Sequence, residues 1–216
     1  MEISPLLATS PLFRGIPAET LPGLLARADA RERRYRKGEL LLHRGETAGR
    51  LGLVLSGAVH IVREDFWGSR EIVGLAEAGD VFAESYALSG EPLEVSVLAA
   101  TDVAALFLDA AAFSGGAEVR LTANLLSLLA GKNLQLTRKM RHMARRTTRE
   151  KLLSYLSAQA LLAGGPEFDI PLDRQQLADF LAVDRSAMSA ALGKLRDEGV
   201  LEFRKNHFRL LRREEL

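Results

Sequence analysis

The feature that most constrains the fold of this chain is a change in the spacing of its apolar residues near Gly115. Before this point, short runs rich in Val, Leu and Ile are separated by glycines, namely Gly45, Gly57, Gly68 and Gly79. After it, the proline-free stretch 117–146 repeats Leu or Met at intervals of three and four residues. Short runs between turn residues are typical of β-strands, and the longer interval is typical of a helix. The sequence therefore predicts a small β-sandwich or barrel followed by one long helix.

The predicted long helix carries a stripe of apolar residues: Leu121, Leu125, Leu128, Leu129, Leu136, Met140 and Met143. Such a stripe can pack on the β-domain of the same chain, or pair with its copy from a second chain in a coiled coil. Both packings are expected, on different faces of the helix. Gly131, Lys132 and Asn133 interrupt the leucines near the middle, so the sequence alone assigns no heptad positions.

The last third of the chain begins with a helix-start signal. Thr147 and Glu150 have the spacing of a capping box, which predicts a new helix after a break near Arg146. The run Gly-Gly-Pro at 164–166 is expected to end this helix, and 168–172 is typical of a short strand.

Two further helices are predicted over 174–181 and 184–196, separated by a tight connection. Two short strands around Asn206 follow them. This order is that of a helix-turn-helix with a β-hairpin wing, in which the second helix enters the DNA major groove by its N-terminus.

In the second of these helices, Met188, Leu192 and Leu195 form the side expected to be buried. Arg185, Ser186 and Ser189 are left to face base edges and phosphates. Arg185 is the best candidate for a base contact, because a guanidinium matches guanine O6 and N7. The alternatives for Arg185 are a phosphate contact or an ion pair with the neighbouring Asp184. Four more residues are expected to contact phosphates, at the start of the preceding helix and on the wing: Arg174, Gln175, Lys205 and Asn206.

The charges of the chain are unevenly placed. Residues 1–119 have 11 Lys and Arg against 17 Asp and Glu, 120–146 have 7 against none, and 147–216 have 11 against 11. The basic block in the middle is either a solvated helix face beside a dimer seam or a direct nucleic-acid contact.

Composition excludes several classes of function. There is no cysteine, so disulfides, thiolate zinc sites, cysteine-held iron–sulfur clusters and thiol redox sensing are excluded. No apolar run reaches the roughly 18 to 20 residues that cross a bilayer, so a cytoplasmic protein without a membrane partner is expected. No Gly-x-Ser-x-Gly, P-loop or His-Glu-x-x-His pattern occurs, and an enzyme is not expected.

Six segments in one order resemble the Crp/Fnr superfamily of bacterial transcription regulators: "KGELLLHRGE", "LSGAVHIV", "GDVFAES", "TTREKLLSYL", "QLADFLAVDRSAMSAALGKLRDEGVLEF" and "KNHFRLL". The resemblance implies an α+β chain with three parts. These are a cyclic-nucleotide-binding-like β-roll over 1–115, a dimerisation helix over 116–146 and a winged helix-turn-helix over 147–216. It also implies a homodimer that binds double-stranded DNA, RNA polymerase and a small-molecule effector.

The resemblance weakens at the segment that holds the cyclic nucleotide. Members that bind cyclic AMP have a Gly-Glu pair, followed about ten residues later by Arg-Ser. This chain keeps Glu84 but has Ala83 in place of the glycine, and Glu94 and Val95 where Arg-Ser would lie. An acid in place of the arginine repels a phosphate and supplies no donor, so an effector other than cyclic AMP is expected.

Iron–sulfur sensing, known in the oxygen-responsive branch of the family, is excluded because the cysteines are absent. Haem stays open as a cofactor, since some members bind it and His43, His60, His142 and His207 are candidate axial ligands. An ordinary histidine is the commoner explanation for each. A small apolar or aromatic effector, or none, fits the sequence equally well.

The resemblance places the effector pocket between the roll and the long helix. Its expected walls come from the cassette region, Glu84, Ser85, Leu88 and Val95, and from the helix, Asn133, Leu136 and Thr137. An effector that touches both parts would favour one packing of the long helices, and the break near Arg146 would pass this to the winged helices.

Overall fold

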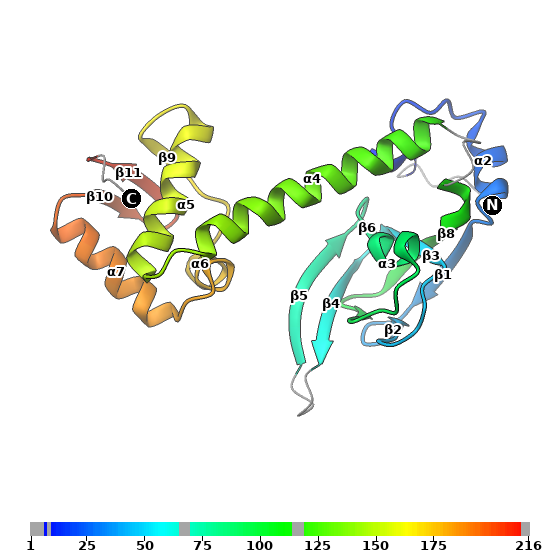
Figure 1. Cartoon of the computed structure of the whole chain (residues 1–216), viewed down its shortest axis with the longest axis horizontal. Coiled ribbons are helices and arrows are strands. Elements are labelled where there is room, and N and C mark those ends of the chain that lie inside the picture. Colours follow the sequence, from blue (N-terminus) through cyan, green and yellow to red (C-terminus); the bar gives the residue numbers. More distant parts are fainter. Residues whose placement is uncertain (1–6, 8–9, 65–69, 114–118, 213–216) are drawn as a thin grey trace. The chain divides into compact units, whose positions relative to one another are not determined.

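The computed structural model describes residues 7, 10–64, 70–113 and 119–212 (Figure 1). The chain divides into two compact units, Met1–Ala130 (unit 1) and Gly131–Leu216 (unit 2). Helix α4, Val119–Met143, contributes residues to both units. Antiparallel sheets come first, then the long helix, then a helical region with a small sheet, so the predicted α+β class is confirmed.

Unit 1 contains two four-stranded antiparallel sheets, with the strand orders β1-β8-β3-β6 and β2-β7-β4-β5. Their strands are β1 Arg31–Tyr35, β2 Leu40–Leu42, β3 Arg50–Ser56, β4 Ala58–Glu64, β5 Arg70–Glu77, β6 Val81–Phe82, β7 Ser96–Ala99 and β8 Val103–Asp109. The helical segments of this unit are η1 Pro11–Phe13, α2 Leu21–Arg27, α3 Glu84–Ser89 and η2 Ala110–Phe113.

The two sheets enclose one hydrophobic cluster, because alternate residues of each strand point to the same face. Val59 of β4, Phe82 of β6 and Phe107 of β8 belong to it, and the rings of Phe82 and Phe107 meet edge to face at 5.9 Å. At Gly52 of β3 a Cβ atom would lie 2.1 Å from the Phe82 ring. Only glycine therefore lets this strand approach the ring so closely.

Two leucines of β8 belong to a second cluster, together with the N-terminal helical segments and the first half of α4. Leu106 and Leu108 of β8 are buried there with Leu121 and Leu125 of α4. Asn124 of α4 donates to the backbone carbonyls of Leu12 and Arg14, each at 2.9 Å. The start of the long helix is thus fixed to unit 1 by packing and by hydrogen bonds.

Unit 2 comprises α5 Thr148–Ala163, β9 Glu167–Asp169, α6 Arg174–Leu181, α7 Arg185–Asp197, β10 Leu201–Arg204 and β11 His207–Leu210. The three strands pair in the order β10-β11-β9. Thr147 and Glu150 form the predicted capping box at the start of α5, and Gly164 ends that helix in the left-handed conformation. None of the helices in the described ranges is long and apolar enough to cross a membrane.

Within unit 2, the last turns of α4 pack on the winged-helix region through His142. This side chain is only 6% exposed, and its Nδ1 lies 2.8 Å from the Oγ of Ser154 on α5. The His142 ring meets Tyr155 edge to face at 5.8 Å, while the ammonium of Lys139 lies 5.4 Å from the ring centre of Phe180. The C-terminal end of α4 therefore belongs to the same packed body as α5 and α6.

We expect the stability of unit 2 to depend on pH through His142. Burial lowers the pKa of His142, and the charges of Arg141 and Arg145 lower it further. The unfolded chain then binds the proton more readily than the folded one, so stability falls as the pH drops below about 6.5.

Thermal unfolding between about pH 7.5 and 5.5 measures this dependence. His207 acts in the opposite sense, since hydrogen bonding to Asp169 raises its pKa. Comparison with His142→Gln isolates the contribution of His142, because the variant removes the titrating group. The parent should lose more thermal stability on acidification than the variant. Equal pH slopes would contradict the assignment of a proton-free His142.

Candidate nucleic-acid interface

Helix α7 is held on one side by burial and is open on the other. Met188, Leu192 and Leu195 are 0%, 1% and 0% exposed and lie in the core of unit 2. Asp184 caps the helix, accepting from the backbone N–H groups of Ser186 at 2.8 Å and Ala187 at 3.0 Å. The hydroxyl of Ser186 and these two N–H groups lower the pKa of Asp184, so the cap stays ionised near neutral pH. The first turn of α7 is thus rigid, and its polar residues are exposed.

The two serines of this turn already use their hydroxyl hydrogens. Ser189 donates to the backbone carbonyl of Arg185 at 2.9 Å, and the hydroxyl of Ser186 bonds to the carboxylate of Asp184. Each oxygen keeps lone pairs that can accept. In this arrangement the serines can accept from the amino groups of adenine or cytosine in the major groove. They are less suited to donate to the carbonyl groups of guanine or thymine.

Arg185 begins the helix with an exposed side chain. Among the residues that the structure describes, its guanidinium has no hydrogen-bond or ion-pair partner. The ion pair with Asp184 that the sequence allowed is therefore not formed, since that carboxylate binds Ser186 and Ala187. The five N–H donors of the Arg185 guanidinium are therefore available to a ligand at the N-terminal end of α7.

The other predicted residue with a guanidinium, Arg174, has partners within the protein. Its side chain donates to the backbone carbonyl of Lys205 at 2.7 Å and stacks over Phe203 and Phe208, at 4.7 and 5.2 Å from the ring centres. Burial lowers the pKa of Arg174. Gln175, next to it, donates to Asp179 at 2.8 Å along the exposed side of α6. Sequence reasoning missed the two phenylalanines, which fix Arg174 beneath the wing.

Lys205 and Asn206 form the turn of the wing between β10 and β11. Lys205 has a left-handed backbone, with φ of 55°, and an exposed side chain. The side chain of Asn206 donates to the carbonyl of Ile170 at 3.0 Å, and the N–H of Ile170 donates back to the carbonyl of Asn206 at 2.9 Å. The amide of Asn206 thus anchors the turn, while the ammonium of Lys205 faces outward.

Of the predicted effector-pocket residues, one group lies around α3 of unit 1. Glu84 begins this helix and is only 6% exposed, whereas Ser85 and Leu88 are exposed and Val95 is half-buried. Ala83 before it has a left-handed backbone, with φ of 57°, a conformation that glycine adopts at less cost. Glu94 is exposed. The second group, Asn133, Leu136 and Thr137, lies on α4 in unit 2 and is exposed. Whether the two groups share one pocket stays a prediction.

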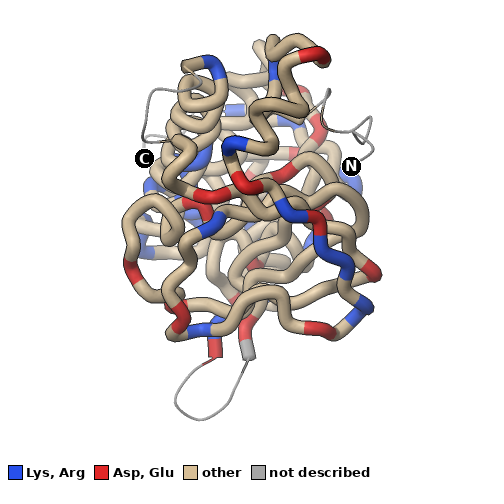
Figure 2. Tube along the Cα trace, turned by 90° about the vertical axis from the view of Figure 1, so that its right-hand side faces the viewer, with Lys and Arg blue, Asp and Glu red and all other residues tan. Residues whose placement is uncertain are grey.

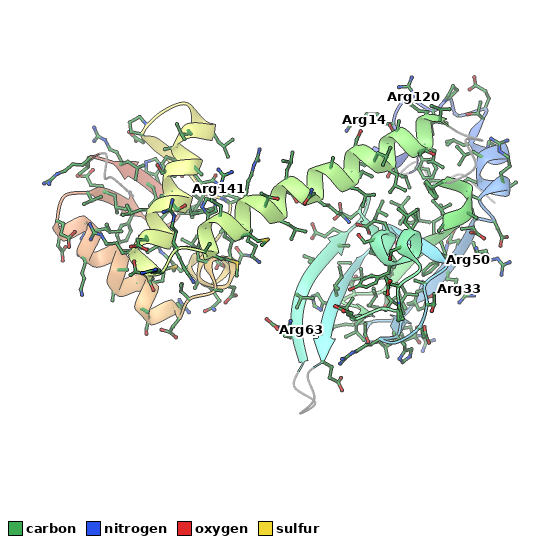
Figure 3. The ribbon with its side chains drawn as sticks, viewed as in Figure 1. Arg14, Arg33, Arg50, Arg63, Arg120 and Arg141 are labelled. Atoms are coloured by element: carbon green, nitrogen blue, oxygen red, sulfur yellow. The ribbon has the colours of Figure 1, made fainter. Side chains whose placement is uncertain are left out.

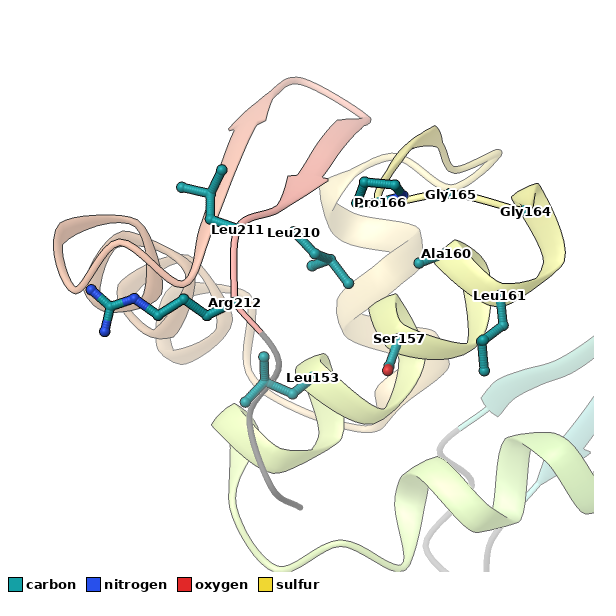
Figure 4. A pocket seen from close by; sticks show the side chains of 10 residues that line it. All are labelled: Leu153, Ser157, Ala160, Leu161, Gly164, Gly165, Pro166, Leu210, Leu211 and Arg212. Atoms are coloured by element: carbon teal, nitrogen blue, oxygen red, sulfur yellow. The ribbon is translucent and has the colours of Figure 1, made fainter.

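Several hollows of the described residues lie outside the predicted sites. In unit 1 a groove of about 500 Å³ is lined by Leu40, His43, Arg44, His60, Val62, Glu64, Ile72, Ser96 and Leu98. In unit 2 a hollow of about 820 Å³ lies between α5 and the chain after β11 (Figure 4). Leu161 and Leu162, at the end of α5, are 83% and 69% exposed. Apolar exposure of this kind is typical of a contact surface.

Basic and acidic residues are interspersed in unit 1, as the blue and red segments of Figure 2 show. Several cations there are paired with acids: Arg31 with Asp29 at 2.9 Å, and Arg63 with Glu71 at 2.7 Å. In contrast, the residues of α4 include cations and no acid between Arg120 and Arg141, which Figure 3 labels near its two ends.

A helix-turn-helix with a wing, joined through a long helix to a two-sheet β-roll, defines the class of DNA-binding regulators with a sensor domain. Comparison with known families agrees with this assignment. The cyclic nucleotide-binding domain family matches residues 32–117, and the Crp-like helix-turn-helix domain family matches residues 150–216. The chain belongs to the Crp/Fnr family of transcription regulators, and it is a DNA-binding regulator rather than an enzyme.

Solved structures show similarity over most of the chain. The catabolite activator protein of Thermus thermophilus is 26% identical, with 93% of each chain covered and a TM-score of 0.54. FixK2 from Bradyrhizobium japonicum is 25% identical, with 85% of this chain and 93% of that chain covered and a TM-score of 0.50. A CooA variant from Carboxydothermus hydrogenoformans shares the fold at 20% identity and a TM-score of 0.58, covering 88% and 86% of the two chains. No curated protein matches the chain in sequence.

Replacing Arg174 with alanine is expected to lower the free energy of unfolding by about 1–3 kcal/mol, because the stacking and the hydrogen bond to the wing are lost. Urea denaturation followed by circular dichroism measures the change. Gln175→Ala is the matched control, since its exposed side chain bonds only a neighbour on α6. An unfolding free energy for Arg174→Ala equal to that of the control would show that Arg174 does not support the wing.

Proposed function

We propose that this protein is a homodimeric, sequence-specific regulator that reads two DNA half-sites with two copies of α7. The observation that carries the proposal is the first turn of α7, which is fixed by the Asp184 cap and by buried Met188, yet presents an exposed Arg185 that has no partner among the described residues. One winged helix per chain reads a single half-site. Two half-sites roughly 34 Å apart require a twofold partner.

Helix α4 supplies the dimer contact in this proposal. Leu126, Leu136 and Met140 are 62%, 61% and 68% exposed on it, although each is a large apolar side chain. Exposed apolar stripes on a long helix are stabilised by pairing with a second helix. Because its target is chromosomal DNA, the regulator acts in the cytoplasm of a bacterial cell.

The residues of the interface divide by role. Arg185 contacts a guanine edge, with Ser186 and Ser189 accepting from neighbouring base amino groups. Lys205 contacts a phosphate from the wing, and Gln175 contacts one at the start of α6. Arg174 and Asn206 hold the wing in place. They contact phosphate only through the charge of Arg174 and through N–H donors that are not already bonded within the protein.

The effector in this proposal is not cyclic AMP. Its pocket is walled by Glu84, Ser85, Leu88 and Val95, and by Asn133, Leu136 and Thr137. The exposed carboxylate of Glu94 repels a cyclic phosphate at the position where an arginine would hold it. A ligand acts by binding one packing of the long helices better than the other, so its affinity alone does not measure its effect.

A haem-based sensor is the second candidate. The placement of the four histidines reduces the number that could serve as an axial ligand. His142 is bonded to Ser154, and His207 lies 3.1 Å from Asp169. His43 and His60 line one groove with apolar neighbours, so an axial ligand would come from these two. An effector-independent regulator is the remaining alternative.

RNA polymerase is the further partner that we propose. The exposed Leu161 and Leu162 beside the hollow of unit 2 offer an apolar contact that α7 does not use. Their replacement by serine would then abolish the effect of the regulator on transcription by purified polymerase, while DNA binding is kept. Unchanged transcription would remove this surface from the proposal.

Arg185→Ala is expected to lose about 1–3 kcal/mol of discrimination at one base pair of each half-site, because the bidentate contact is removed. Binding to unrelated DNA should change little. Fluorescence anisotropy on operators with single base changes measures both quantities. Lys205→Ala serves as the contrast, since loss of a phosphate contact weakens all sequences alike and lowers the salt slope by about 1. Uniform weakening by Arg185→Ala would instead assign it to a phosphate.

Purification from the native host, followed by an absorption spectrum and mass spectrometry of bound small molecules, tests the effector. We expect no Soret band and no co-purified cyclic nucleotide. Calorimetric titration with cyclic AMP should show no saturable binding up to about 1 mM, which corresponds to less than 4.1 kcal/mol of affinity. Micromolar binding of cyclic AMP would contradict the argument from Glu94, and a Soret band would favour the haem sensor.

A further inference from the structure

Two basic side chains in the first turn of α5 contact the chain at the two ends of α7. The ammonium of Lys151 donates to the backbone carbonyls of Leu181 and Ala182, at 3.2 and 3.3 Å. Arg149 donates to the carboxylate of Glu198, the C-cap residue of α7, at 2.5 Å. One contact therefore lies just before α7 begins, and the other lies where α7 ends.

The carbonyls that Lys151 binds lie at the C-terminal end of α6. The last carbonyls of a helix have no donor within it, and the helix dipole favours a cation there. Helix α5 gains nothing from a cation in its own first turn, where the dipole favours an anion. Ala182 ends α6 with a left-handed backbone, φ 49°, and its N–H group bonds back to α6. Since Asp184, two residues further along, caps α7, Lys151 fixes the turn from which α7 starts.

The bonds of Lys151 add a restraint that the apolar core does not supply. Met188 and Leu192 of α7 lie in the same buried cluster as Leu156 of α5. Apolar burial is non-directional, whereas a hydrogen bond depends on both distance and angle. Lys151 therefore supplies a directional contact close to the end of α7 that carries Arg185.

We propose that Lys151 is a positioning residue for DNA recognition, which holds the α6–α7 turn so that Arg185 reaches its base edge. This inference rests on the proposed function of α7 and adds a residue that determines its placement. Lys151 is half-buried, and its ammonium is bonded to two carbonyls of the protein rather than left for DNA. The side chains of Arg149 and Glu198 are 35% and 50% exposed, so solvent weakens their pair and its contribution is smaller.

Lys151→Met tests the proposal, because it removes the ammonium and keeps the length of the side chain. We expect the preference for an operator selected from a randomised pool over unrelated DNA to fall about tenfold, since the bidentate contact of Arg185 depends on its placement. The salt slope of binding should not change, because no phosphate contact is lost. Fluorescence anisotropy with both duplexes at several salt concentrations measures the two quantities.

Lys205→Met is the matched contrast, with the same substitution at the tip of the wing. There the salt slope should fall by about 1 while the preference is kept. A lower salt slope for Lys151→Met would assign Lys151 to a phosphate and overturn the inference. Lys151→Arg should keep the preference of the parent, because a guanidinium can also donate to two carbonyls. Equal losses in the methionine and arginine variants would show that the bonds to α6 are not the cause.

Combination with Arg185→Ala separates positioning from a general loss of structure. If Lys151 acts through Arg185, Lys151→Met causes no further loss of discrimination in the Arg185→Ala chain, whereas independent effects add. Additive losses would overturn the inference. All variants are compared below the unfolding temperature of the least stable one, measured by circular dichroism. Lys151→Gln, a milder change that keeps a polar side chain, takes the same test where the methionine variant does not fold.

The parent chain separates failure of this inference from failure of the proposed function. A parent that prefers no DNA sequence would refute the proposed function. A parent that discriminates, with Lys151→Met discriminating equally well, would overturn only the role of Lys151.

Discussion

Helix α4 has more apolar surface than one chain can cover, and this constraint underlies both the architecture and the proposed assembly. Leu121 and Leu125 are buried in unit 1, while His142 is buried in unit 2 against Ser154. The exposed row that includes Leu126 and Met140 remains uncovered. A helix that is fixed at both ends and apolar on a free side is suited to connect a sensor with a DNA reader through contact with a second copy.

In the proposed DNA-binding surface, some polar side chains bond within the protein and others are left exposed to a ligand. Asp184 uses its carboxylate to cap α7, Arg174 stacks beneath the wing, and Asn206 closes the turn. These polar groups bond within the protein and hold the shape of the surface. Arg185 and Lys205 remain as exposed cations at the helix end and at the wing tip. The proposal therefore assigns affinity and specificity to these two side chains, and the other residues act by holding the surface in place.

The fold could be predicted from the sequence because its signals are local. The change of apolar spacing near Gly115 and the capping box of Thr147 each depend on neighbouring residues, and the sheets, the long helix and the helix start all follow them. The candidate site was less accessible, because tertiary contacts decide it. No local pattern shows that Phe203 and Phe208 engage Arg174.

Selection of duplexes from a randomised DNA pool, followed by sequencing, tests the central claim most directly. The account predicts an enriched, approximately palindromic site whose half-sites are centred one helical turn apart, about 10 base pairs, with two chains bound per duplex. A guanine that loses its preference when Arg185 is replaced would tie that pattern to α7. Enrichment of a single unpaired half-site, or of no sequence at all, would contradict the account.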